Sequence, residues 1–263
     1  MIKHWIITGD THGRVVTRIE NIKRNMSEYS PKETAIIILG DAGLNYYLNK
    51  TDKKEKKAVN DYGYLVYCVR GNHEARPSVV PEMEYFEDKE VKNFVYYQRE
   101  FPNIRYFIDG FDYEINGMKT LIIGGAYSVD KNYRLEMGYQ WFENEQLDFS
   151  ERSNITNKLT YHKYDLILAH TCPYSWRPID LFLSCIDQST VDSTMELWLE
   201  ENKEKFNDSI YLFGHYHDNR LVRPKVEMYY YKFDTLDNIV ARWASGKQPD
   251  YYYPKDPNYF YGR

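Results

Sequence analysis

Residues 4–13 read HWIITGDTHG, an apolar run that ends in a glycine-rich turn with three polar side chains. The run from His4 to Thr8 has the length and the isoleucine content of a buried strand. Asp10 and His12 follow this run, so a carboxylate and an imidazole stand at the carboxyl end of the predicted strand. Both groups are common ligands of divalent cations.

Further apolar runs alternate with amphipathic segments along the chain. We predict buried strands at Ala35 to Leu39, Leu65 to Val69, Asp165 to Ala169 and Ser209 to Phe213. Helices are expected at Val15 to Met26, Lys53 to Val59, Phe142 to Asn157 and Thr190 to Phe206. Shorter strands are expected at Ile104 to Asp109, at Asp112 to Ile115 and Lys119 to Ile123 around a turn at Asn116-Gly117, and within Lys225 to Phe233 and Asn238 to Trp243. This order predicts an α/β fold with two layers.

Composition limits the class of protein. The 263 residues are 43% hydrophobic and 28% charged, as in ordinary globular proteins. They contain no repeat and no Pro/Gly/Ser-rich linker, so we predict a single domain over residues 1–263 with an aromatic tail at 245–263. The net charge of -5 argues against long-range attraction to nucleic acid or to membrane surfaces, while a local basic pocket for nucleic acid stays open. The expected partner is a small phosphate ester or a phosphorylated substrate.

The expected location is the cytoplasm. The chain opens on a short apolar run without the features of a signal peptide, and no apolar stretch approaches the roughly 18 residues that cross a bilayer. Its three cysteines, Cys68, Cys172 and Cys185, are odd in number and irregularly spaced, which favours reduced thiols over a disulfide framework.

Polar residues follow several of the predicted strands, and their side chains suit a metal centre. They are Asp10, His12, Asp41, Asn72, His73, His170, His215 and His217. Loops at the carboxyl ends of strands share one edge of an α/β sheet, so these residues can converge there. A set of imidazole, carboxylate and amide donors without thiolate suits Mn²⁺, Fe or Zn²⁺. The set exceeds the needs of one ion and matches two divalent ions about 3.5–4 Å apart.

Each motif has a structural alternative when it is taken alone. Asp10 and His12 can belong to a turn with an Asx hydrogen bond, and Asn72 can occupy a left-handed turn position. His170 can be a buried histidine with hydrogen-bond partners. The order of the motifs and their shared place after strands favour the metal centre over these alternatives.

In sequence, the motifs run Asp-x-His, Gly-Asp, Gly-Asn-His-Glu, His and Gly-His-x-His, which resembles the calcineurin-like metallophosphoesterase superfamily from Asp10 to His217. The resemblance implies a mixed-sheet, two-layered sandwich flanked by helices. It also implies that Asp10, His12, Asp41 and His217 surround one metal ion and that Asp41, Asn72, His170 and His215 surround the other, with Asp41 as the bridge. A hydroxide between the ions would be the nucleophile.

The resemblance gives His73 the role of general acid or phosphate donor; a purely structural role beside the ligands is the alternative. Family members often carry an aspartate three residues after the bridging one, where this chain has Leu44. Glu74, a backbone carbonyl or water is then expected to orient His73.

Substrate choice is the least determined point. Gly71-Asn72-His73-Glu74 resembles the Ser/Thr protein phosphatase branch, whereas Gly214-His215-Tyr216-His217 is closer to phosphodiesterases. Arg134, Arg70 and Arg76 are the predicted phosphate-binding residues, with Arg134 preferred, and surface ion pairing is the alternative for each. Arg177 is a further candidate.

Three functions remain open from sequence. The first is hydrolysis of phosphomonoesters or phosphodiesters by two divalent ions, with Mn²⁺ the expected metal. The second is a Ser/Thr-type protein phosphatase, against which the absence of an Asp-Arg-Gly motif after Asp41 counts. The third is a non-catalytic metal-binding interaction module. The tyrosine-rich tail is expected to pack on the domain or on a partner.

Overall fold

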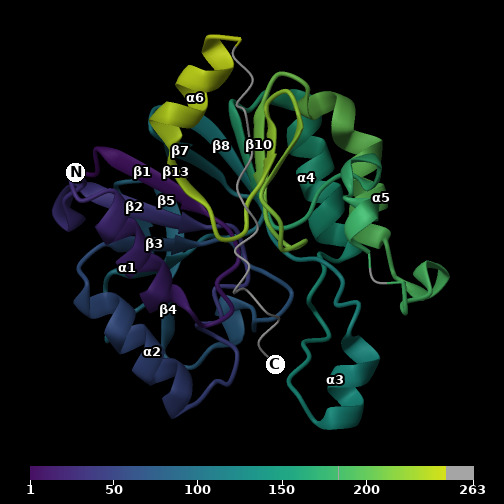
Figure 1. The fold of residues 1–263 in the computed structure, drawn as a ribbon, viewed down its shortest axis with the longest axis horizontal. Helices are drawn as coiled ribbons and strands as arrows, with labels where there is room; N and C mark the ends of the chain where they lie inside the picture. Colours follow the sequence, from purple (N-terminus) through teal and green to yellow (C-terminus); the bar gives the residue numbers. More distant parts are fainter. Residues whose placement is uncertain (183, 247–263) are drawn as a thin grey trace.

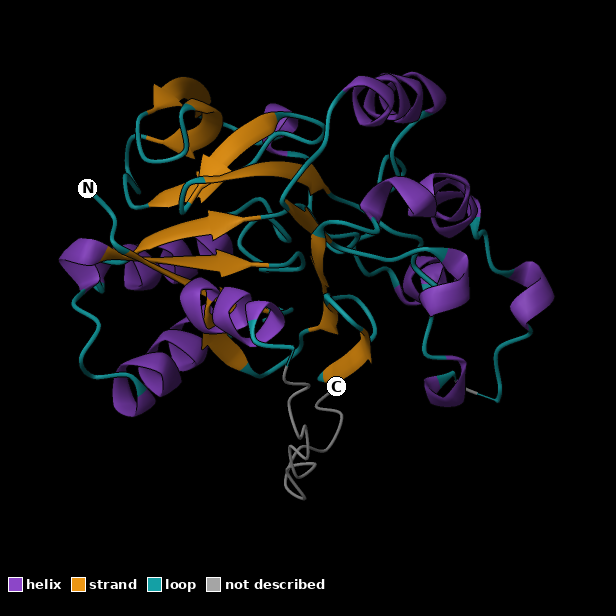
Figure 2. Ribbon diagram, turned by 90° about the horizontal axis from the view of Figure 1, so that it is seen from above, coloured by secondary structure: helices purple, strands orange, loops and turns teal. Residues whose placement is uncertain are grey.

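Two β-sheets face each other at the centre of the molecule (Figure 1), and helices lie on both sides of the strands (Figure 2). The computed structural model describes residues 1–182 and 184–246. Seven strands form the first sheet, in the spatial order β13 (Phe233–Thr235), β1 (His4–Thr8), β2 (Thr34–Ile38), β3 (Leu65–Cys68), β6 (Ile104–Tyr106), β5 (Asn93–Gln98) and β4 (Met83–Asp88). Six strands form the second, in the order β11 (Arg220–Arg223), β12 (Val226–Met228), β10 (Ile210–Phe213), β9 (Leu166–Ala169), β8 (Met118–Ile123) and β7 (Asp112–Ile115).

Both sheets are mixed. Strands β1, β2, β3 and β6 are parallel to their neighbours among themselves, as are β8, β9, β10 and β12. Antiparallel strands flank each parallel group, namely β13, β5 and β4 in the first sheet and β7 and β11 in the second. The predicted mixed-sheet sandwich is confirmed.

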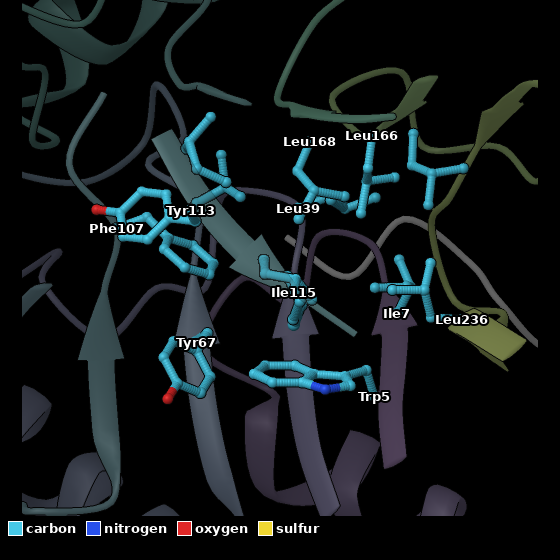
Figure 3. Packing of buried hydrophobic residues seen from close by; sticks show 14 of the residues in the cluster. Trp5, Ile7, Leu39, Tyr67, Phe107, Tyr113, Ile115, Leu166, Leu168 and Leu236 are labelled. Atoms are coloured by element: carbon cyan, nitrogen blue, oxygen red, sulfur yellow. The ribbon is translucent and has the colours of Figure 1, made fainter. Parts of the chain in front are cut away.

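Alternation of side chains along the strands builds three apolar layers. In β1, Trp5 and Ile7 point into the space between the sheets, whereas Ile6 belongs to the layer on the outer face. Figure 3 shows Trp5 and Ile7 in the inner layer with Leu166 and Leu168 of β9 from the opposite sheet. Parallel strands buried on both faces explain why these segments read as continuous apolar runs.

Helices cover the outer faces of the sheets and one end of the inner layer. On the first sheet these are α1 (Val15–Asn25) and α2 (Lys50–Asp61), and on the second they are α4 (Phe149–Tyr161) and α5 (Thr194–Asn202). At the end of the inner layer lies α6 (Leu236–Ala244), whose Leu236 and Ile239 are fully buried. The short helix α3 (Lys131–Met137) has no buried residue and projects from the body of the molecule (Figure 1). None of the described helices is long and apolar enough to cross a bilayer.

Some predicted elements were wrong or misplaced. The strand expected at Asn238 to Trp243 is part of α6, which starts where the Thr235 hydroxyl accepts a hydrogen bond from Asn238 N at 3.2 Å. The helix expected from Phe142 begins only at Phe149, because Asp148 forms a capping box with Glu151. Residues 247–263, most of the predicted aromatic tail, lie outside the described residues.

Candidate metal centre

Strand ends of both sheets supply the predicted site residues. Asp10, Asp41 and Asn72 follow the parallel strands β1, β2 and β3, so they lie at one edge of the first sheet. His170 and His215 follow the parallel strands β9 and β10 of the second sheet. The Leu39 carbonyl after β2 accepts a hydrogen bond from His170 Nδ1 at 2.9 Å, so the two edges meet. The convergence expected from sequence is present in the structure.

The first group of donors consists of Asp10, His12 and His217, whose ligand atoms lie within 4.8 Å of one another. His12 Nε2 and His217 Nε2 are 2.8 Å apart. Asp10 Oδ2 lies 3.6 Å from His217 Nε2. Asp10 is buried, while both imidazoles are open to solvent, so this side of the centre is accessible from outside.

The second group is buried and lies around Asn72. Its Oδ1 is 2.8 Å from His170 Nε2 and 3.2 Å from His215 Nδ1. Asp41 Oδ2 lies 3.6 Å from His170 Nε2 and 4.0 Å from His12 Nε2, so this oxygen stands between the two groups. Asp10 is also near the second group, since its ligand atom lies within 4.8 Å of those of Asp41 and His170.

Several donors sit on strained backbone. His12, Asp41, His215 and His217 all have positive φ angles, of 45°, 47°, 71° and 54°. Residues with a Cβ avoid this region at a cost of order 1–3 kcal/mol each, and such strain concentrates at functional sites.

Gly40 permits a close approach between the two sheets. It has a φ of +93°, and a Cβ at this position would lie 2.0 Å from His170 Nδ1. Any other residue would therefore displace the His170 ring or the backbone that precedes Asp41. The glycine of the Gly-Asp motif is required by packing as well as by backbone conformation.

The electrostatics of the centre favour a bound cation. Burial and the neighbouring Asp41 carboxylate raise the pKa of Asp10 well above its ordinary value. Burial also lowers the pKa of His170 and His215, and desolvation by the surrounding groups together with the neighbouring His12 lowers the pKa of the partly exposed His217 to about 4. These three imidazoles are therefore neutral near pH 7 and do not supply the positive charge that the paired carboxylates need.

The hydrogen bonds around His170 also favour a bound cation. Because His170 Nδ1 donates to Leu39, the neutral ring has a lone pair on Nε2. This lone pair faces Asn72 Oδ1, which is also an acceptor. Two acceptors 2.8 Å apart repel each other unless a cation or a proton lies close to both. The residues present thus fit divalent metal ions, and their nitrogen and oxygen donors suit Mn²⁺, Fe or Zn²⁺.

His73 stands beside the donors without belonging to either group. Its Nε2 lies 3.2 Å from Asn72 Nδ2 and 3.4 Å from Arg134 Nη2. Burial and the Arg134 charge contribute to lowering the pKa of His73 to about 4. Leu44 is buried in the outer apolar layer of the first sheet, and Glu74 accepts a hydrogen bond from Gly71 N at 2.9 Å. Asn72 and Arg134 are therefore the observed partners of the His73 ring, and Glu74, one of the candidates suggested by sequence, is bonded to Gly71 instead.

Arg134 is the predicted substrate arginine that reaches the site. It extends from α3, and its Nη1 donates to the Tyr46 hydroxyl at 3.1 Å while its Nε pairs with Asp130 at 2.8 Å. Its Nη2 faces His73. Tyr46 and Asp130 thus hold the guanidinium next to His73, between α3 and the proposed metal centre.

Arg70 and Arg76, the two other arginines predicted to bind substrate, have protein partners in the structure. Arg70 is 3% exposed and pairs with Asp109 at 2.7 Å. Arg76 pairs with Glu151 at 2.5 Å. Each guanidinium is also held by backbone carbonyls, whereas Arg134 is the arginine that contacts His73. Arg177 stacks over the Tyr174 ring at 3.4 Å.

Sequence reasoning missed three residues next to the centre. Tyr46 contacts Arg134, and Ser128 accepts a hydrogen bond from Asn72 Nδ2 at 2.9 Å. Ser128 in turn donates to Glu145, which is 3% exposed. None of these residues lies in a metal motif, so no local pattern indicated them.

The chain is similar to known proteins along most of its length. The model of the calcineurin-like phosphoesterase family matches residues 4–252. Among solved structures, TT1561 of Thermus thermophilus is similar at 11% sequence identity and a TM-score of 0.44, over 89% of this chain and 98% of that one. No curated protein matches. The family match spans every donor described above, and it shows that this chain belongs to the calcineurin-like phosphoesterase family.

Proposed function

We propose that this chain hydrolyses phosphomonoesters or phosphodiesters with two divalent metal ions, Mn²⁺ being the expected metal. The family supports metal-dependent phosphoester hydrolysis in general. The observation that carries the proposal is the placement of Asp41 Oδ2 between His12 Nε2 at 4.0 Å and His170 Nε2 at 3.6 Å. A carboxylate oxygen in this position can bridge two cations.

Two sets of donors would hold the ions. Asp10, His12, Asp41 and His217 would surround one, and Asp41, Asn72, His170 and His215 would surround the other. Asp41 Oδ1 accepts a hydrogen bond from His73 N at 2.8 Å, which leaves Oδ2 for the bridge. When bound, the ions would supply Lewis acidity that activates water and neutralises charge on the phosphoryl oxygens.

His73 and Arg134 would act on the substrate. Both lie on the same side of the centre, with His73 Nε2 and Arg134 Nη2 3.4 Å apart. Arg134 would bind phosphoryl oxygens through its guanidinium, and Tyr46 and Asp130 hold it in place. His73 would act as a hydrogen-bond donor to phosphate in the neutral form that its lowered pKa favours near pH 7, or as general acid on the leaving oxygen once the ring has taken up a proton.

The proposal is tested with purified protein that has been stripped by a chelator and loaded again with Mn²⁺. The loaded protein is expected to cleave p-nitrophenyl phosphate or bis-p-nitrophenyl phosphate, and the stripped protein is expected to be inactive. The ratio between the two rates shows whether monoesters or diesters are preferred. Failure on both esters by a protein that has bound two ions per chain would refute hydrolysis of simple esters.

A further inference from the structure

Ser128 and Glu145 connect Asn72 to the segment that carries Arg134. Both are buried, with exposed fractions of 1% and 3%. They lie at the two ends of residues 128–145, which include α3 and Arg134. Asn72 Nδ2 donates to Ser128 Oγ at 2.9 Å, and Ser128 Oγ donates to Glu145 Oε2.

The direction of each hydrogen bond follows from the chemistry of Glu145. Its Oε1 accepts from Ser128 N at 3.0 Å, and its Oε2 accepts from Trp141 Nε1 at 3.0 Å. An ionised carboxylate only accepts, so the proton of the Ser128 hydroxyl is directed to Glu145. The Ser128 oxygen can then only accept from Asn72, and this requires the amide nitrogen of Asn72 to face Ser128.

The two hydrogen bonds from Asn72 to Ser128 and from Ser128 to Glu145 form a relay, and this relay determines which end of the Asn72 amide faces the histidines. With Nδ2 turned to Ser128, Oδ1 lies 2.8 Å from His170 Nε2 and 3.2 Å from His215 Nδ1. A flipped amide would present two N–H groups there, and these cannot bind a cation. The orientation of the side chain is thus imposed from outside the set of proposed ligands.

We infer that Ser128 and Glu145 are positioning residues that set the orientation of the Asn72 amide for metal binding, and that they tie the Arg134 segment to the same ligand. The inference rests on the proposed metal centre and adds to it two residues from outside the motifs. Arg70 strengthens the connection, since its Nη1 donates to the Glu145 carbonyl at 2.7 Å. Outer partners of metal ligands typically change affinity by about 10–100-fold when they are removed.

Calorimetric titration of the stripped, full-length protein with Mn²⁺ tests the inference without substrate. Ser128→Ala removes the acceptor of Asn72 Nδ2. In Glu145→Gln the side-chain oxygen must still accept from Ser128 N, so the amide nitrogen faces Ser128 Oγ and Trp141 Nε1. This nitrogen donates to Ser128 Oγ, which reverses the direction of the hydrogen bonds in the relay. In both variants the affinity for one of two Mn²⁺ ions is expected to fall by about 10–100-fold while the other ion binds as in the wild type.

The Mn²⁺ affinity of the double variant tests whether the two residues act through the same hydrogen bonds. Because both residues act through one relay, Ser128→Ala combined with Glu145→Gln should weaken Mn²⁺ binding no more than the stronger single variant. Ser209→Ala is the matched control: Ser209 is 2% exposed and donates to the Tyr164 carbonyl at 2.7 Å, between β9 and β10 at their opposite ends from the site. This control should lower the melting temperature and leave both affinities unchanged.

The outcomes separate this inference from the proposed function. Lower melting temperatures with two unchanged Mn²⁺ affinities in Ser128→Ala and Glu145→Gln would overturn the positioning role. A wild type that binds fewer than two ions would overturn both claims. A wild type that binds two ions and cleaves no ester would refute the function, while the affinities of the variants would still decide the role of the relay.

Discussion

His170 Nδ1 donates a hydrogen bond to the carbonyl oxygen of Leu39 at 2.9 Å, and this bond joins the second sheet to the first at the edge where the proposed ligands meet. It fixes the tautomer of a fully buried imidazole. The free lone pair on Nε2 is then directed toward Asn72 and Asp41. One contact between the sheets thus joins them at the site and orients a proposed metal ligand.

Gly40→Ala tests how closely the sheets must approach. The new methyl group would meet His170 Nδ1 at 2.0 Å on a backbone with φ of +93°. We expect a loss of about 3 kcal/mol or more in the free energy of unfolding and weaker Mn²⁺ binding, measured by urea denaturation and calorimetry. Gly117→Ala is the control, because φ there is +74° and nothing lies within 4 Å of the added carbon. Equal losses in the two variants would show that the contact with His170 carries no cost.

His73→Ala separates catalysis from metal binding. We expect turnover of p-nitrophenyl esters to fall by about 10²–10⁴-fold, as for loss of a general acid, while two Mn²⁺ ions per chain remain. His162→Ala, at the exposed end of α4, should retain full activity. A His73→Ala variant that keeps wild-type turnover would remove this residue from the mechanism.

Arg134→Ala tests recognition of the phosphoryl group. Loss of a charge-assisted hydrogen bond to substrate should cost roughly 1.5–3 kcal/mol, seen as a decrease of about 10–100-fold in kcat/KM. Arg134→Lys should recover little of it, because an ammonium cannot contact Tyr46, Asp130 and phosphate in the same planar geometry. Arg99→Ala is the control, since the Arg99 side chain is 79% exposed. An unchanged kcat/KM in Arg134→Ala would exclude contact with substrate.

The lowered pKa of Lys56 predicts that the free energy of unfolding changes with pH, and this prediction does not involve the proposed metal ligands. Burial lowers the pKa of this side chain from 10.5 to about 8, and its Nζ donates to Gln98 Oε1 at 2.7 Å. Between these two pKa values the unfolded chain holds one proton more than the folded chain, so the contribution to stability rises with pH across this window. Below pH 8 the full cost of the buried charge is present.

Urea unfolding of the wild type and Lys56→Met between pH 7 and 10 measures this effect. The wild type should gain about 2–3 kcal/mol relative to the variant as the pH rises. The variant removes the titrating group and leaves the other ionisable side chains in place. A difference between the two proteins that stays constant over this range would contradict the depressed pKa.

Much of the fold could be predicted because buried parallel strands are distinctive. Runs such as Ala35 to Leu39 are apolar on both faces, and the structure buries each of these residues. The hairpin of β4 and β5 was missed because its residues mix exposed and buried positions, with Tyr85 66% exposed. The error at Asn238 to Trp243 arose because a short apolar segment fits a strand as well as a helix, and here the Thr235 cap decides for the helix.

The proposed ligands could be found from sequence for a different reason. Each follows a strand, and the fold brings strand ends together regardless of the chain length between them. Arg70 shows the limit of this reasoning: it adjoins the Gly-Asn-His-Glu motif, yet it points to Asp109. Ser128 and Glu145 were missed because they contact Asn72 only through the tertiary structure, and the spacing of residues in the sequence does not indicate such contacts.

Anomalous diffraction from crystals loaded with Mn²⁺ tests the central claim most directly. The account predicts two peaks per chain about 3.5–4 Å apart, one next to Asp10, His12 and His217, the other next to Asn72, His170 and His215, with Asp41 Oδ2 between them. A single peak, or two peaks that do not share Asp41, would contradict it.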